Sequence, residues 1–285
     1  MRAALMLLAA CNGSMEAYFA EDVVHQIDDV VYVDGSTNPR QRLDLVIPRD
    51  VDSFPVVVFI HGGFWIHQDK DYFQPFVGLY HNVGIALGRH GIGSAIIDYR
   101  LVPEVTFEGQ LDDVAAAIGW IHDHIAEHGG DPGAMVVAGH SAGGHIAALL
   151  AFDDGRLTSR GVDVGAIRGY APLSPILDLV KMAQASSDDA AIGEEVFGDQ
   201  LVADSPVTYF HAAVQPVLLV LGTNDLDFLR DQVPPAADAL QAMGAPVEFD
   251  QIDGASHDDI VVQFDTDDDR VTPLLSAFVA RVVSP

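Results

Sequence analysis

Three short, almost uninterrupted apolar runs constrain the fold of this 285-residue chain more than any other feature. They read PVVVFIH from Pro55, AMVVAGH from Ala134 and PVLLVLG from Pro216. Strands that are apolar at every position, rather than at alternate positions, are typical of a parallel sheet that helices cover on both faces. Because parallel strands need crossover connections, such a chain must also supply helices between its strands.

Five further runs rich in β-branched residues bring the predicted strands to eight. The predicted strands are Val30–Asp34, Arg42–Pro48, Pro55–His61, Ile92–Tyr99, Ala134–His140, Ile167–Leu173, Pro216–Leu221 and Val247–Ile252. The first two alternate between apolar and polar residues and are separated only by a loop rich in turn-forming residues. We therefore expect these two strands to form an antiparallel edge of the sheet.

A clear helical pattern lies between the fourth and fifth predicted strands. Its apolar residues are three or four positions apart, at Leu111, Val114, Ile118, Ile121 and Ile125, and a glycine pair at residues 129–130 ends it. Strands that alternate with helices predict an α/β fold with a right-handed, mostly parallel sheet. In such sheets ligands bind beyond the carboxyl ends of the strands, so we expect the chemistry in the loops that follow them.

The first eleven residues, MRAALMLLAAC, need to be set apart from the fold. They resemble the start of a bacterial lipoprotein, in which residues 8–11 match the processing box and Cys11 becomes the lipidated first residue. This predicts a signal-like segment at 1–20, one catalytic domain at 21–285, and an exported protein anchored through Cys11 in the periplasm or outer membrane. The alternative is a cytoplasmic enzyme whose N-terminal segment is frayed or buried. Cys11 is the only cysteine, so the chain forms no internal disulfide.

Acidic side chains outnumber basic ones by three to one. The chain has 42 Asp and Glu, of which 34 are aspartate, against 14 Lys and Arg, and its formal net charge is −28. This charge repels polyanions, so we expect neither nucleic acid nor an anionic membrane surface as a partner. Such an acidic, lysine-poor chain resembles proteins from salty habitats, where high ionic strength relieves self-repulsion, and we expect salt to stabilise it.

The sequence GHSAGG places a serine at the sharpest bend of the chain. Gly139, Ser141 and Gly143 form a G-x-S-x-G pattern between the apolar run AMVVA and the helix-favouring run HIAALLA. At a strand-to-helix junction this pattern holds the serine in a strained conformation that exposes its hydroxyl group. The N–H of Ala142 and the positive end of the following helix are suited to stabilising an oxyanion. We therefore predict that Ser141 is a nucleophile.

A second glycine-containing segment, HGGFW at 61–65, follows the third predicted strand. Gly62 and Gly63 would supply further oxyanion-hole N–H groups, because glycine lets a substrate approach the backbone closely; the alternative is a simple tight turn. Phe64 and Trp65, together with His140 beside the serine, are predicted to line the substrate pocket, although either aromatic ring could belong to the core. His61 is expected to organise this loop rather than to transfer protons.

A serine nucleophile needs a general base and an acid that orients it. Of the twelve histidines, only His257 follows the seventh predicted strand, and the expected order in this type of sheet is serine, acid, histidine. The acid should follow the same strand, where LGTNDLD offers Asp225, which we prefer, and Asp227 as the alternative. The predicted catalytic residues are therefore Ser141, Asp225 and His257.

These motifs, together with IIDYRLVPE, resemble the α/β-hydrolase superfamily over about residues 40–260. The resemblance is to the carboxylesterase branch that includes kynurenine formamidases, feruloyl-type esterases and isoprenylcysteine methylesterases. It implies an eight-stranded, mostly parallel sheet with a small cap at about 176–212 that shapes the pocket. It also implies that Asp98–Arg100 is a structural signature.

The resemblance implies a serine esterase that acts on small to medium esters through an acyl-enzyme, with a small-molecule ester as its partner. No metal or organic cofactor is expected. Two alternatives remain open. One is an amidase-type relative such as a kynurenine formamidase, and the other is a non-catalytic binding protein of the same fold, although such proteins usually lack a triad member.

Overall fold

The computed structural model describes residues 23–73 and 78–284 of the chain. The predicted N-terminal segment at 1–20, including Cys11, lies outside the described residues. Eight strands form a single sheet in the order β1-β2-β4-β3-β5-β6-β7-β8. The two pairs β1–β2 and β2–β4 are antiparallel, whereas every other neighbouring pair is parallel. The predicted α/β class and the antiparallel edge are therefore confirmed.

Seven of the eight strands agree with the sequence-based prediction to within a few residues. The strands are β1 Val24–Val31, β2 Arg42–Pro48, β3 Phe54–Ile60, β4 Gly93–Ile97, β5 Gly130–His140, β6 Ile167–Leu173, β7 Val217–Asn224 and β8 Val247–Ser256. The first strand was predicted wrongly at Val30–Asp34. Its pairing with β2 is interrupted between Ile27 and Val30, where Asp29 has a positive φ of 59°, and this irregularity hides the strand's alternation in the sequence.

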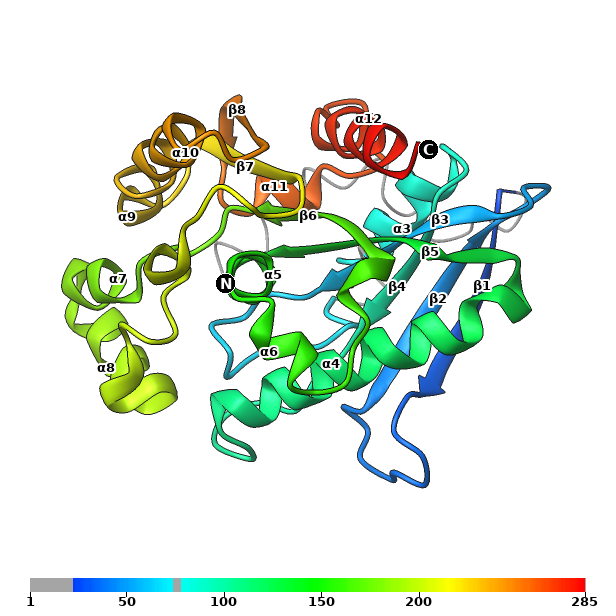
Figure 1. The fold of residues 1–285 in the computed structure, drawn as a ribbon, viewed down its shortest axis with the longest axis horizontal. Helices are drawn as coiled ribbons and strands as arrows, with labels where there is room; N and C mark the ends of the chain where they lie inside the picture. Colours follow the sequence, from blue (N-terminus) through cyan, green and yellow to red (C-terminus); the bar gives the residue numbers. More distant parts are fainter. Residues whose placement is uncertain (1–22, 74–77, 285) are drawn as a thin grey trace.

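Helices cover both faces of the sheet (Figure 1). The α-helices are α3 His81–Gly88, α4 Phe107–His124, α5 Ala142–Phe152, α6 Gly155–Thr158, α7 Leu179–Ala185, α8 Ser187–Phe197, α9 Asp227–Arg230, α10 Val233–Ala242, α11 Asp259–Val262 and α12 Val271–Val283. The 3₁₀ turns are η1 Ile125–His128, η2 Val164–Ala166, η3 Gly198–Gln200 and η4 Pro206–Tyr209. Two large clusters of buried apolar residues follow from this arrangement. One joins the sheet to α4 and α5, and the other joins it to α3, α11 and α12.

The helix that was predicted between the fourth and fifth strands is α4. Its apolar stripe is buried, and the side chain of Thr106 accepts a hydrogen bond from the N–H of Gly109 to cap its first turn. At the other end, Gly129 has a φ of 88°, a conformation that ends a helix at little cost only for glycine. In the described part of the chain, no helix is both long and apolar enough to cross a membrane.

The topology gathers five loops at one edge of the sheet. Because β3, β5, β6, β7 and β8 run parallel, their carboxyl ends lie side by side. The residues that directly follow these strands are His61, Ser141, Ser174, Asp225 and His257. Four of the five are residues that sequence analysis singled out, and the fifth, Ser174, was not foreseen. The position of the site therefore follows from the fold.

Candidate active site

Ser141 lies at a strained turn between β5 and α5. Its φ of 57° and ψ of −116° are unusual for a residue with a side chain, and its N–H donates to the carbonyl oxygen of Leu173 over 3.0 Å. A Cβ on Gly143 would lie 2.0 Å from the carbonyl oxygen of Ile60, and one on Gly139 would lie 2.4 Å from that of Gly143. The two glycines of the motif are therefore required by close backbone packing, and this packing holds the serine at the end of the strand.

His257 and Asp225 come together beside Ser141. Nδ1 of His257 donates to Oδ1 of Asp225 over 2.8 Å, which leaves Nε2 as the ring atom that can accept a proton. His257 and Ser141 line the same cavity. The alternative acid, Asp227, is 88% exposed and forms an ion pair with Arg230, so it does not reach the imidazole. Between the two candidate acids, the geometry selects Asp225.

Ser174 is a fourth member of this cluster. Its hydroxyl donates to Oδ2 of Asp225 over 2.5 Å, while the N–H of Leu226 donates to Oδ1 over 2.7 Å. Burial alone would raise the pKa of Asp225, but the hydrogen bonds from His257, Ser174 and Leu226 hold it below its ordinary value. Asp225 is thereby kept as a carboxylate that can orient His257. The sequence carried no signal for Ser174 beyond its position after a parallel strand.

His140 supports the His257 loop from the neighbouring strand. Its Nε2 lies 3.0 Å from the carbonyl oxygen of His257, and the centroids of the two imidazole rings are 4.6 Å apart. Because a carbonyl only accepts, Nε2 of His140 carries a proton. Burial and the nearby His257 lower the pKa of His140 to about 3, so it stays neutral. His140 also lines the cavity, in agreement with its predicted place in the pocket.

The predicted oxyanion hole is only partly available. The N–H of Ala142 is in the first turn of α5, where a helix offers no acceptor, and Gly63 lines the cavity. The N–H of Gly62, in contrast, donates over 3.1 Å to the hydroxyl oxygen of Tyr80, which in turn donates to Oε1 of Gln68 over 2.5 Å. Gly62 therefore differs from expectation, because its N–H already donates to Tyr80, and the N–H groups of Gly63 and Ala142 remain the candidate donors.

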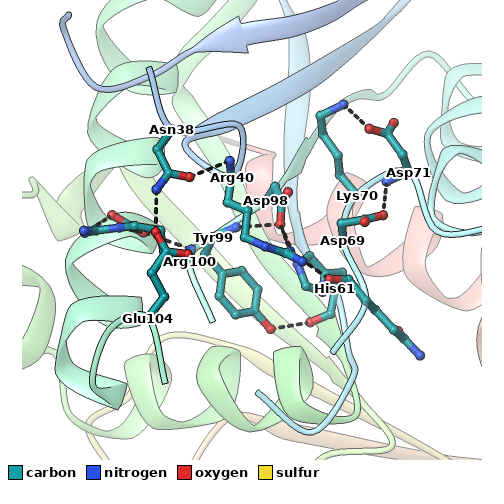
Figure 2. Close-up of polar contacts among 12 residues, drawn as sticks. Asn38, Arg40, His61, Asp69, Lys70, Asp71, Asp98, Tyr99, Arg100 and Glu104 are labelled. Atoms are coloured by element: carbon teal, nitrogen blue, oxygen red, sulfur yellow. Dashed lines mark hydrogen bonds and ion pairs between the residues drawn. The ribbon is translucent and has the colours of Figure 1, made fainter. Parts of the chain in front are cut away.

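His61 ties this loop to β4 (Figure 2). Its Nε2 lies 3.0 Å from Oδ1 of Asp98, and its Nδ1 lies 2.7 Å from the carbonyl oxygen of Gly62. Asp98 also accepts from Arg40 over 3.2 Å, and the hydroxyl of Tyr99 donates to the carbonyl oxygen of His61 over 3.0 Å. These contacts agree with the expected organising role of His61 and with a structural role for the DYR motif.

The cavity that Ser141 and His257 share has a volume of about 410 Å³. Most of its lining side chains are aromatic or aliphatic. Besides Ser141, His257 and Tyr80, the lining side chains come from Phe64, Gln68, Tyr72, Phe73, Leu79, His140, Asp258, Val261 and Val262. The expected lining by Phe64 is therefore observed.

Trp65, the other predicted aromatic wall, is not part of the cavity. Its indole ring is fully buried and packs edge-on against two rings. The centroid distance is 5.1 Å to His145 and 4.8 Å to Phe197 of α8. The cap predicted at 176–212 forms α7, α8, η3 and η4, but none of the described lining residues belongs to it. Phe197 of this segment packs against Trp65, and a role of the segment in shaping the pocket stays a prediction.

One cluster of described residues has the composition of a metal site. Asp28, Asp44 and His81 each offer a ligand atom within 4.8 Å of the others. However, Nζ of Lys70 already lies 2.9 Å from Asp44 and 3.1 Å from Asp29. Although burial alone would lower the pKa of Lys70, the carboxylates of Asp44 and Asp71 raise it above its ordinary value, so a protein cation already balances part of the charge of this cluster.

Comparison with known proteins identifies the family. The BD-FAE family model matches residues 43–235, which include Ser141 and Asp225 but end before His257. The chain belongs to the BD-FAE family. The α/β-hydrolase resemblance proposed from the sequence motifs is thereby confirmed.

Relatives and solved structures agree with this assignment. The chain is 29% identical to isoprenylcysteine alpha-carbonyl methylesterase of Arabidopsis thaliana, over 91% of this chain and 62% of that protein. It is 41% identical to carboxylesterase NlhH of Mycobacterium tuberculosis over 100 residues, or 35% of this chain and 30% of that one. A crystal structure of esterase B from Lactobacillus rhamnosis superposes with a TM-score of 0.78 at 20% identity, covering 94% of this chain and 91% of that one. The chain spans between about half and three fifths of the length of the plant methylesterases that it matches.

Proposed function

We propose that this protein is a serine carboxylesterase that hydrolyses small to medium esters through an acyl-enzyme. The observation that carries the proposal is the 2.8 Å hydrogen bond from Nδ1 of His257 to the buried Asp225, with His257 and Ser141 lining one cavity. This bond fixes the tautomer in which Nε2 accepts a proton. A serine hydroxyl is a poor nucleophile, and such a base is what it needs to react.

The reaction follows from these groups. Nε2 of His257 takes the hydroxyl proton of Ser141 as Oγ bonds to the ester carbonyl carbon, and the N–H groups of Gly63 and Ala142 stabilise the resulting oxyanion. The tetrahedral intermediate collapses, the ester C–O bond breaks, and His257 returns the proton to the leaving alcohol. A water molecule then attacks the acyl-enzyme with the same base, which releases the carboxylic acid and regenerates Ser141.

The cavity and the relatives support the same class of substrate. A volume of about 410 Å³ lies near the lower end of the range for small-molecule sites, and the lining is mostly apolar. The similar proteins include a methylesterase and a carboxylesterase. Both names describe hydrolysis of carboxylic esters. A kynurenine formamidase of Drosophila melanogaster is also similar, at 24% identity over 87% of this chain and 80% of that one, so a substrate panel has to decide between the ester reaction and the amidase alternative.

A substrate panel with Ser141→Ala tests the proposal. We expect the wild-type protein to hydrolyse 4-nitrophenyl acetate and butyrate, and the variant to lose about 10⁴- to 10⁶-fold in kcat. N-formylkynurenine in the same panel tests the amidase alternative. The control is Ser94→Ala, which removes another buried serine hydroxyl outside the site. Hydrolysis that Ser141→Ala leaves unchanged would refute the assignment.

A further inference from the structure

Aromatic side chains form part of the lining of the cavity beside Ser141. Phe64, Tyr72 and Phe73, called the aromatic wall below, all line it, and the ring centroids of Tyr72 and Phe73 are 4.1 Å apart. Phe73 is 38% exposed, which is unusual for a phenylalanine. The faces of aromatic rings carry partial negative charge and attract cations that come within about 6 Å of the ring centre.

The lining of the cavity also includes a carboxylate. Asp258 directly follows His257, is exposed, and lines the same cavity. Within residues 23–73 and 78–284, its side chain makes no hydrogen bond or ion pair. The N-terminal end of α11, which begins one residue later, is likewise not capped by it.

The charge of Asp258 is not balanced inside the cavity. Among the lining residues that the structure describes there is no lysine or arginine, and the histidines present are His140 and His257. Burial raises the pKa of Tyr80, which also lines the cavity, and the nearby Tyr72, Asp258 and Asp69 raise it further. The net charge of −28 adds to this field at low ionic strength.

We propose that the site discriminates among esters by charge. It takes esters that carry an ammonium group in preference to esters of the same shape that carry a carboxylate, and Asp258 sets this preference. The inference rests on the proposed esterase function, because it concerns the same cavity. The aromatic wall and the carboxylate act together: the rings hold the cationic group, and Asp258 favours its approach and repels an anion.

Matched substrates test this inference. They are three 4-nitrophenyl esters whose acyl chains have the same length and end in a methyl, a trimethylammonium or a carboxylate group. The quantity to measure is the ratio of kcat/KM for the cationic ester to kcat/KM for the anionic ester. Any effect of a mutation on the triad itself cancels in this ratio. We compare the wild-type protein with Asp258→Asn and with Asp238→Asn, which removes one negative charge from an exposed position on α10.

We expect a wild-type ratio above one that falls roughly 2- to 25-fold in Asp258→Asn, because an exposed charge changes each of the two interactions by about 1.5- to 5-fold. Asp238→Asn should leave the ratio within twofold of wild type. High salt should lower the wild-type ratio, since the Debye length falls to about 3 Å at 1 M. A wild-type ratio of one or less, or an equal ratio in Asp258→Asn, overturns the inference.

Binding can be measured apart from turnover. Calorimetry with Ser141→Ala, which keeps the esters intact, should give tighter binding of the cationic ester than of the anionic ester. The difference should shrink in the double variant that also carries Asp258→Asn. If the wild-type protein hydrolysed none of the three esters, the proposed function would fail, while the calorimetric comparison would still decide the charge preference.

Discussion

Replacement of Ser174 with alanine removes the hydrogen bond from the Ser174 hydroxyl to Asp225 and changes few other contacts. The hydroxyl of Ser174 is fully buried and donates to Oδ2 of Asp225 over 2.5 Å. The backbone of Ser174 has a positive φ of 46°, but serine and alanine both carry a Cβ, so the strain is equal in the two proteins. The change in stability therefore reports the hydrogen bond to the carboxylate.

The expected magnitude follows from the charge of the acceptor. A hydrogen bond to a charged group contributes about 1.5 to 3 kcal/mol, so we expect the free energy of unfolding of Ser174→Ala to fall by about that amount at neutral pH. The pKa of Asp225 is lower in the folded protein than its ordinary value. Stability from a lowered carboxylate pKa is fully present above the ordinary pKa and is lost as pH falls through the folded value. The deficit of the variant should therefore shrink in acid.

Urea denaturation at pH 7 and at several lower pH values measures this difference. The matched control is Ser94→Ala, because the Ser94 hydroxyl is buried and has no hydrogen-bond partner among the described residues. The control should lose less stability than Ser174→Ala, because a buried hydroxyl that makes no hydrogen bond can be removed without breaking one. A loss in Ser174→Ala no larger than in the control, or a deficit that grows as pH falls, would refute the reasoning.

Three further outcomes follow from the structure. Tyr80→Phe leaves the Gly62 N–H without its hydrogen-bond partner, so kcat for 4-nitrophenyl butyrate should fall about tenfold with little change in KM. Its control is Tyr170→Phe, which removes a buried hydroxyl elsewhere and should not change kcat. Gly143→Ala would place a Cβ 2.0 Å from the carbonyl oxygen of Ile60, so urea denaturation should show a loss above about 3 kcal/mol or no folded protein. Because the net charge is −28, raising NaCl from 0.1 to 2 M should increase the melting temperature, and an unchanged or lower melting temperature would argue against the acidic-surface hypothesis.

The sheet could be predicted from the sequence wherever the strands are buried on both faces. Such strands carry continuous apolar runs, and β3, β5 and β7 were placed correctly for that reason. The bounds of the edge strand β1 were harder to predict. Asp28 and Asp29 interrupt its alternation of apolar and polar residues, at an irregularity that depends on pairing with β2. The positions of Ser141, Asp225 and His257 followed from motif order and strand succession, and the structure brings these three residues together.

Contacts that depend on tertiary packing could not be predicted. Ser174 and Tyr80 hold their partners through hydroxyl groups, and nothing in the local sequence distinguishes these two from other serines and tyrosines. Trp65 follows Phe64 in sequence, yet one ring is buried in the core and the other lines the cavity. The φ values of the two residues, 54° and 64°, are positive, so the alternation expected of an extended chain did not apply.

The burial of Lys70 has a practical consequence for chemical conjugation. The chain has two lysines, Lys70 and Lys181. The side chain of Lys70 is 3% exposed and its pKa is raised by the carboxylates around it, so reagents that need a free, uncharged amine should not reach it. The side chain of Lys181 is 55% exposed on α7, which does not contribute to the described lining of the cavity. Of the two lysines, amine-directed reagents should therefore label Lys181 and leave the cavity open.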